Sequence, residues 1–144
     1  MADPYHLQRF VDAQSGIYRQ VVGELRAGRK RGHWMWFVFP QLKGLGRTGT
    51  AEHFGIASLA EARAYLDHPV LGPRLRECAA ELAAVAGPIE LVLGEVDALK
   101  LRSSMTLFAR AAGDGGDPAV FESVLHRHYG GIADARTLEM LSTD

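Results

Sequence analysis

The chain has 144 residues, of which 47% are hydrophobic, and its formal net charge is −1 at pH 7. This size and composition predict a single globular domain over residues 1–144 with one buried core. A net charge near zero provides no overall electrostatic attraction to nucleic acid or to an acidic membrane surface, so nucleic acid is not an expected partner. The single cysteine, Cys78, excludes an internal disulfide bond.

The N-terminal segment MADPYHLQRF has no cationic start followed by an apolar core, which a targeting segment would have. The apolar run at residues 34–39 is far shorter than the roughly 20 residues that a membrane span requires. We therefore expect a cytoplasmic protein without a membrane partner.

The first predicted helix covers residues 5–26, where apolar residues recur at helical spacing. Gln14 lies inside this apolar stripe. A buried amide costs free energy unless it is paired or faces a polar pocket, so Gln14 is a candidate ligand-binding residue.

Residues 29–49, RKRGHWMWFVFPQLKGLGRTG, combine cations, aromatic rings and glycines. GLGRTG matches the letters of the dinucleotide-binding pattern GxGxxG, but residues 40–43 separate the glycines from the apolar run and no clear βαβ unit follows. We interpret the stretch as one wall of a pocket, where a tryptophan stacks on a planar ligand and cations meet its phosphate. The alternative is that the rings form core and the cations form its solvated rim.

The candidate ligand-binding residues of this stretch are Lys30, His33, Trp34, Trp36, Gln41, Gly44, Gly46 and Arg47. The pattern leaves open whether residues 34–39 form a strand or a helix.

Further helices are predicted over residues 59–66, behind a capping box of Ser58 and Glu61, and over residues 69–87. IELVLG, residues 89–94, is compatible with one short strand. Helices then follow over residues 97–113, over 119–129 before two glycines, and over 135–141 behind Asp134. The expected fold is mainly α, a single compact domain of about six helices with at most a minor short β element.

Polar residues lie on the apolar face of the predicted helix at residues 97–113. Asp97, Lys100 and Ser104 would supply a carboxylate, a cation and a hydroxyl along one line, which makes them candidate catalytic residues. Ser103 is added as a ligand-binding candidate. The alternative is structural: Asp97 caps the helix, Lys100 pairs with it at i+3, and the serines permit close helix packing.

The six histidines have no metal-ligand spacing, because His126 and His128 diverge on their helix and the others are isolated. We expect neither a bound metal nor a cofactor. A triad of Ser104, His33 and Asp97 is compatible with the sequence, although no segment resembles a nucleophile elbow.

Five segments, FVDAQ, GRKRGHWMWFVFPQLKGLGR, HPVLGPRL, DALKLRSSMTLF and DARTL, together resemble the bacterial family known as domain of unknown function eighteen-ten, whose members often carry the label calpastatin. The resemblance spans residues 10–141 and implies a small, mainly helical fold without an established activity. The family's usual RSHWMW reads RGHWMW here, with Gly32 in place of a hydroxyl.

In size and helical content the chain is also similar to the superfamily of NAD- and ADP-ribose-associated proteins. Some members of that superfamily cleave N-glycosidic bonds of nucleotide-like substrates. The superfamily's terminal Gly-Asn-Leu-Gly block has no counterpart in this sequence.

Two functional hypotheses follow. In the first, the protein hydrolyses an N-glycosidic bond in a nucleotide-like or ADP-ribose-like small molecule: Trp34 or Trp36 stacks the base, Arg47 and Lys30 hold phosphate, and Asp97 assists water or stabilises the cationic sugar. In the second, the protein is a noncatalytic helical module that recognises a nucleotide or a partner through the same aromatic cleft. The sequence leaves the oligomeric state open.

Overall fold

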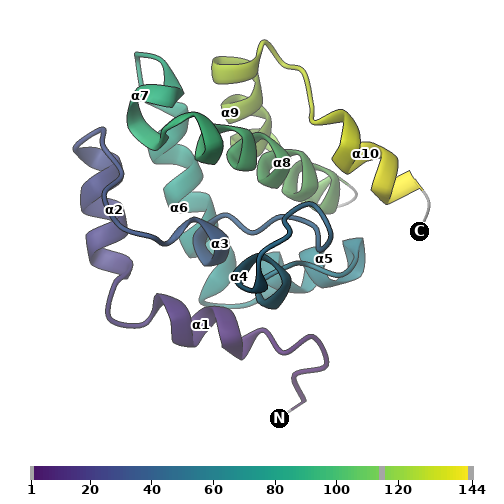
Figure 1. Cartoon of the computed structure of the whole chain (residues 1–144). Coiled ribbons are helices and arrows are strands. Elements are labelled where there is room, and N and C mark those ends of the chain that lie inside the picture. Colours follow the sequence, from purple (N-terminus) through teal and green to yellow (C-terminus); the bar gives the residue numbers. More distant parts are fainter. Residues whose placement is uncertain (1, 114–115, 143–144) are drawn as a thin grey trace.

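Helix α8 (Glu95–Ala112) runs through the middle of the molecule in the computed structural model, which describes residues 2–113 and 116–142 (Figure 1). It packs against α5 (Leu59–Asp67), α7 (Ile89–Leu93), α9 (Ala119–Tyr129) and α10 (Ala135–Ser142). Because helices cover it on several sides, it buries serine and threonine as well as apolar side chains.

The described residues form ten helices, so the prediction of about six was wrong in number although the mainly helical class is confirmed. The helices not yet named are α1 (Gln8–Gln14), α2 (Tyr18–Arg26), α3 (Met35–Val38), α4 (Gly49–His53) and α6 (Leu71–Ala83). Much of the difference comes from single-turn helices, which are too short to produce a periodic pattern.

The predicted helix over residues 5–26 is broken into α1 and α2. Gly16 adopts a left-handed conformation, with φ of 84°, and Ser15 is extended. A glycine takes this conformation without the steric cost that a side chain imposes. The apolar stripe continues through the break, which is why periodicity alone predicted one helix.

IELVLG is not a strand, because residues 89–93 form helix α7. Pro88 precedes α7, and Gly94 ends it with φ of 86°. Among the described residues the β pairing is confined to one isolated parallel bridge between Leu42 and Ile56. Residues 35–38 form the single turn α3, which answers the question left open for the tryptophan-rich run.

The capping signals at Ser58, Asp134 and Gly130 are confirmed, whereas Asp97, the cap in the structural alternative, lies inside α8, whose N-cap is Gly94. The Ser58 hydroxyl accepts a hydrogen bond from the Glu61 N–H at 3.1 Å, and Asp134 accepts one from the Thr137 N–H at 2.9 Å. Helix α9 ends at Gly130, which is left-handed with φ of 63°. These signals depend on neighbours within four residues, so they are visible in sequence.

A chain of four buried rings forms the centre of the core. Phe10 contacts Tyr65 with ring centroids 5.1 Å apart, Tyr65 contacts Phe108 at 5.2 Å, and Phe108 contacts Phe121 at 6.0 Å. The rings join α1, α5, α8 and α9, and aromatic contacts of this kind add to the stabilisation from burial. None of the described helices has both the length and the apolar character that crossing a membrane requires.

Candidate functional site

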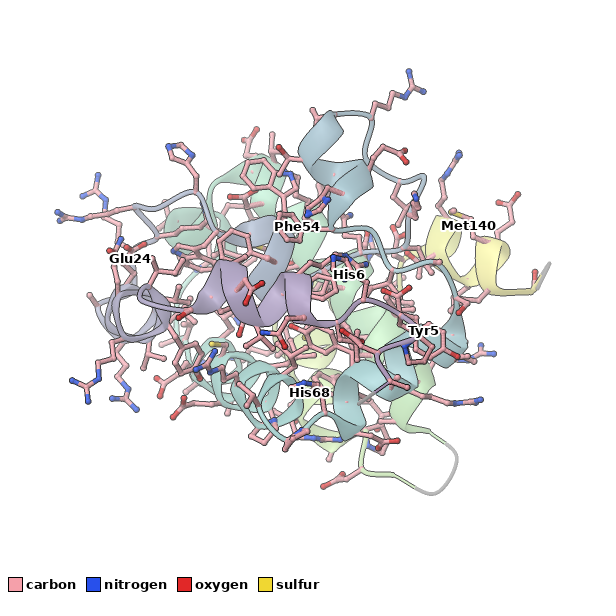
Figure 2. All side chains as sticks on the ribbon, turned by 90° about the horizontal axis from the view of Figure 1, so that it is seen from below. Tyr5, His6, Glu24, Phe54, His68 and Met140 are labelled. Atoms are coloured by element: carbon pink, nitrogen blue, oxygen red, sulfur yellow. The ribbon has the colours of Figure 1, made fainter. Side chains whose placement is uncertain are left out.

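Glu24 on α2 holds the loop that leads into the tryptophan-rich run. Its carboxylate accepts hydrogen bonds from the backbone N–H groups of Arg31 at 2.6 Å and Gly32 at 2.9 Å, and from the Trp34 indole N–H at 3.0 Å. Gln20 donates to its other oxygen at 2.8 Å. Figure 2 labels Glu24 on this helix.

The pKa of Glu24 reflects two opposed effects. Burial favours the neutral acid and raises the pKa, but the hydrogen bonds from the N–H groups of Arg31 and Gly32 favour the carboxylate, and the pKa falls to about 2. Sequence reasoning missed Glu24. The available signal was that a buried indole N–H requires an acceptor, and that a carboxylate lies between Val22 and Leu25 of the apolar stripe.

Lys30 joins this loop to α8. Its ammonium donates to the Gly32 carbonyl at 2.6 Å, lies 2.9 Å from Asp97 Oδ2, and stands 5.1 Å from the centre of a Trp34 ring. Its backbone N–H donates to the Val92 carbonyl at 2.8 Å. Two residues that are 67 positions apart in the sequence, Lys30 and Asp97, therefore form one ion pair.

Lys100 approaches the same carboxylate from α8. Its ammonium lies 3.5 Å from Asp97 Oδ1 and 4.8 Å from the centre of a Trp36 ring. The Asp97 side chain keeps 18% of its surface exposed, so this arrangement is accessible from solvent. We call Lys30, Trp34, Trp36, Asp97 and Lys100 the Asp97 cluster.

The Asp97 cluster carries more positive than negative charge, because two lysines surround one carboxylate. Trp34 is buried, whereas Trp36 is only partly buried, so Trp36 is the tryptophan that a ligand could reach. The structural alternative from the sequence is also partly realised, since Asp97 and Lys100 do pair at i+3.

The serines of α8 lie away from this surface. Ser103 is buried and donates to the Leu99 carbonyl at 3.4 Å. Ser104 has no exposed surface, and its hydroxyl has no hydrogen-bond partner among the described residues. The structure therefore does not bring Ser104 to the solvent-accessible side of Asp97.

We expect Ser104→Ala to leave the free energy of unfolding unchanged or to raise it by up to about 1 kcal/mol, because the change removes a buried hydroxyl without a partner. Urea unfolding followed by circular dichroism measures this. The same variant should keep any turnover of the wild type. A loss of turnover at unchanged stability would support the catalytic role that the sequence predicted.

Gln14 is engaged by protein groups. Its side-chain N–H₂ donates to the Phe37 carbonyl at 2.7 Å and to the Tyr65 hydroxyl at 3.3 Å, and its carbonyl accepts from Arg74 at 3.3 Å. The amide thus links α1 to α3, α5 and α6. These contacts pair the buried amide of Gln14 with other protein groups, so its place in the apolar stripe has a structural explanation.

The predicted residues Trp36, Gln41 and Gly46 meet at a small hollow beside α4. Its volume is about 10 Å³, close to the roughly 10–15 Å³ that a cavity needs to hold one water molecule. No ligand of nucleotide size fits inside it as it stands. His33, Gly44 and Arg47 are exposed.

The GLGRTG segment does not form a dinucleotide-binding turn, because it follows the bridge residue Leu42 and leads into the five-residue helix α4. Within the part of the chain that the structure describes, no group of three or more His, Cys, Asp or Glu side chains is placed to hold a metal ion.

The chain is similar to a described protein family and to a solved structure. A family model described as "Protein of unknown function (DUF1810)" matches residues 4–141. The crystal structure of the conserved hypothetical protein Rv1873 from Mycobacterium tuberculosis is 56% identical, with a TM-score of 0.93, covering 97% of this chain and 99% of that chain. No curated protein matches this chain. The relation to NAD- and ADP-ribose-associated proteins stays a prediction.

Proposed function

This chain belongs to the family described as "Protein of unknown function (DUF1810)", and we propose that it hydrolyses the N-glycosidic bond of a nucleotide-like or ADP-ribose-like small molecule at the Asp97 cluster. The observation that supports this proposal is the position of Asp97. Its accessible carboxylate lies between two ammonium groups, one of which rests on the face of Trp36.

The charges of the Asp97 cluster suit a phosphorylated substrate. Lys30 and Lys100 attract phosphate. The partly exposed ring of Trp36 stacks on the base. Lys100 now occupies one face of that ring, so a phosphate that draws Lys100 away also frees the ring.

Asp97 supplies the charge that the reaction needs. In the proposed step the bond between the sugar C1′ and the base nitrogen breaks, and its electron pair leaves on that nitrogen. A water oxygen adds to C1′, and this water releases a proton to solvent. The departing base takes up a proton from solvent. The Asp97 carboxylate stabilises the positive charge that develops on the sugar.

We expect Asp97→Asn to lower turnover by at least 100-fold without loss of ligand affinity, because the amide keeps the shape but not the charge. Tm should fall moderately, because Lys30, whose side chain is 10% exposed, loses its anionic partner. NAD, ADP-ribose and nucleoside monophosphates are incubated with the protein, and the released base is measured by chromatography. Glu95→Gln is the matched control, because Glu95 lies in the same first turn of α8 but is exposed. An unchanged rate in Asp97→Asn would reject the role of Asp97.

A noncatalytic nucleotide- or partner-binding module is the second candidate. It is favoured by the ion pairs with Lys30 and Lys100, which already pair both oxygens of the Asp97 carboxylate with protein cations. Under this function no base is released from any ligand, and Trp36→Ala weakens binding at least tenfold. Trp34→Phe is not a suitable control because Trp34 is buried, so the exposed change Glu95→Gln serves as the control.

A further inference from the structure

A second cavity, of about 470 Å³, lies between α8, α9 and the segment that leads into α10. Figure 1 shows α10 beside the C-terminal half of α8. The apolar side chains of Ala109, Leu125 and Leu138 line this cavity together with the polar side chains of Arg110, Glu122 and His126. Its volume falls in the range of about 300–1,000 Å³ that is usual for small-molecule sites.

Hydrogen bonds hold the wall of this cavity in place. The Thr106 hydroxyl donates to the Arg102 carbonyl at 2.8 Å and accepts from the Asp134 N–H at 2.9 Å. The Arg102 guanidinium donates to the carbonyls of Ile132 at 2.9 Å and Ala133 at 3.3 Å. The segment before α10 is thus fixed to α8, so the cavity is preformed.

The charges at the rim come from two facing helices. Arg110 belongs to α8, whereas Glu122 and His126 are one turn apart on α9. All three residues are exposed, and no hydrogen bond or ion pair among residues 2–113 and 116–142 engages their side chains. A cation and an anion without partners therefore stand at the mouth of an apolar cavity.

We infer that this cavity binds a short apolar peptide with free termini, of about dipeptide size. The apolar side chains lie against Ala109, Leu125 and Leu138, the terminal carboxylate meets Arg110, and the terminal amine meets Glu122. Packed helices lie about 8–10 Å apart. A ligand that bridges charges on both helices thus needs its own charges several ångströms apart, as they are in a dipeptide.

This site is separate from the Asp97 cluster. Asp97 and Arg110 are 13 residues apart on α8, which corresponds to roughly 20 Å at about 1.5 Å per residue. Figure 2 labels Glu24, which holds the cluster's loop, and Met140 of α10, and these two residues lie on opposite sides of the molecule. The inference therefore does not rest on the proposed hydrolysis, and Asp97→Asn should bind the peptide as the wild type does.

The test compares leucyl-leucine with its N-acetylated and C-amidated forms by calorimetry. We expect leucyl-leucine to bind at least tenfold more tightly than either blocked form. Arg110→Gln should remove the preference over the amide, and Glu122→Gln the preference over the acetylated form. Glu95→Gln, an exposed change outside the cavity, should keep both preferences.

A third variant tests whether the apolar lining of the cavity contributes to peptide binding. Ala109→Leu fills the cavity from a partly buried position and should abolish binding while Tm stays the same or rises. The inference is overturned if leucyl-leucine does not bind at 10 mM, which is about ten thousand times a micromolar Kd. Equal binding of the blocked forms would overturn it as well.

Discussion

Arg9→Met is expected to lower the free energy of unfolding by about 3–5 kcal/mol, the cost typical of breaking a buried ion pair on one side. The Arg9 guanidinium lies 2.9 Å from Glu61 Oε2 and also donates to the carbonyls of His53 at 2.9 Å, Gly55 at 3.1 Å and Tyr5 at 2.6 Å. Methionine keeps an unbranched stem but leaves the Glu61 carboxylate buried without its cation. Urea unfolding followed by circular dichroism measures the loss.

The control for this prediction is Arg26→Met. Arg26 also forms an ion pair, with Glu81 at 3.1 Å, but its side chain is 60% exposed whereas that of Arg9 is 9% exposed. Exposed ion pairs contribute about 0–1 kcal/mol to the free energy of unfolding, because solvent screens their charges. Adding Glu61→Gln to Arg9→Met should recover part of the loss. If Arg9→Met costs no more than Arg26→Met, the buried pair does not stabilise the fold.

Glu24→Ala is expected to lower the free energy of unfolding by about 3 kcal/mol, because it leaves three N–H donors without their acceptor. These are the backbone groups of Arg31 and Gly32 and the indole of Trp34. The change should also shift tryptophan fluorescence, since the Trp34 indole loses its hydrogen bond. Chemical unfolding at pH 7 with both readouts measures the effect, and Glu95→Ala, an exposed position, is the control.

The lowered pKa of Glu24 predicts that the free energy of unfolding depends on pH. The pKa of Glu24 is lowered from its ordinary value of 4.5 to about 2 in the folded protein. Its contribution to stability is therefore fully present above pH 4.5 and is lost as the pH falls towards 2, because the unfolded chain takes up the proton first. After allowance for solvent screening, we expect the charged form of Glu24 to contribute about 2 kcal/mol to the free energy of unfolding.

Comparison with Glu24→Gln isolates this contribution, because glutamine retains an acceptor but does not titrate. Between pH 5 and pH 2.5 the wild type should lose about 2 kcal/mol more stability than Glu24→Gln. Parallel losses in the two proteins would show that Glu24 is not the titrating group. Unfolding midpoints in urea at each pH provide the measurement.

Part of the candidate site could be predicted from the sequence, because the geometry of a helix is local. Asp97 and Lys100 are three positions apart on one helix, so their pairing follows from the helix itself. The hydrolytic and binding hypotheses both depended on a tryptophan near this pair, and Lys100 does contact Trp36. Which of the two tryptophans is accessible followed only from packing, since both belong to the same short run.

The charged residues that hold the fold were missed for a physical reason. No role was predicted for Arg9 or Glu24, because charged side chains are rarely buried. Their burial depends on acceptors and donors supplied by other segments, such as Gly55 for Arg9 and Trp34 for Glu24. No local pattern encodes such partners.

By itself the sequence determined the helical class, the family and the helix ends marked by Ser58, Asp134 and Gly130, because caps and glycine conformations depend on neighbours along the chain. Only the tertiary structure decided which polar groups meet. It placed Lys30 against Asp97, enclosed Ser104 in the core, and opened a cavity between α8 and α9. These outcomes follow from the packing of segments distant in the chain, where burial and pairing are set by three-dimensional neighbours.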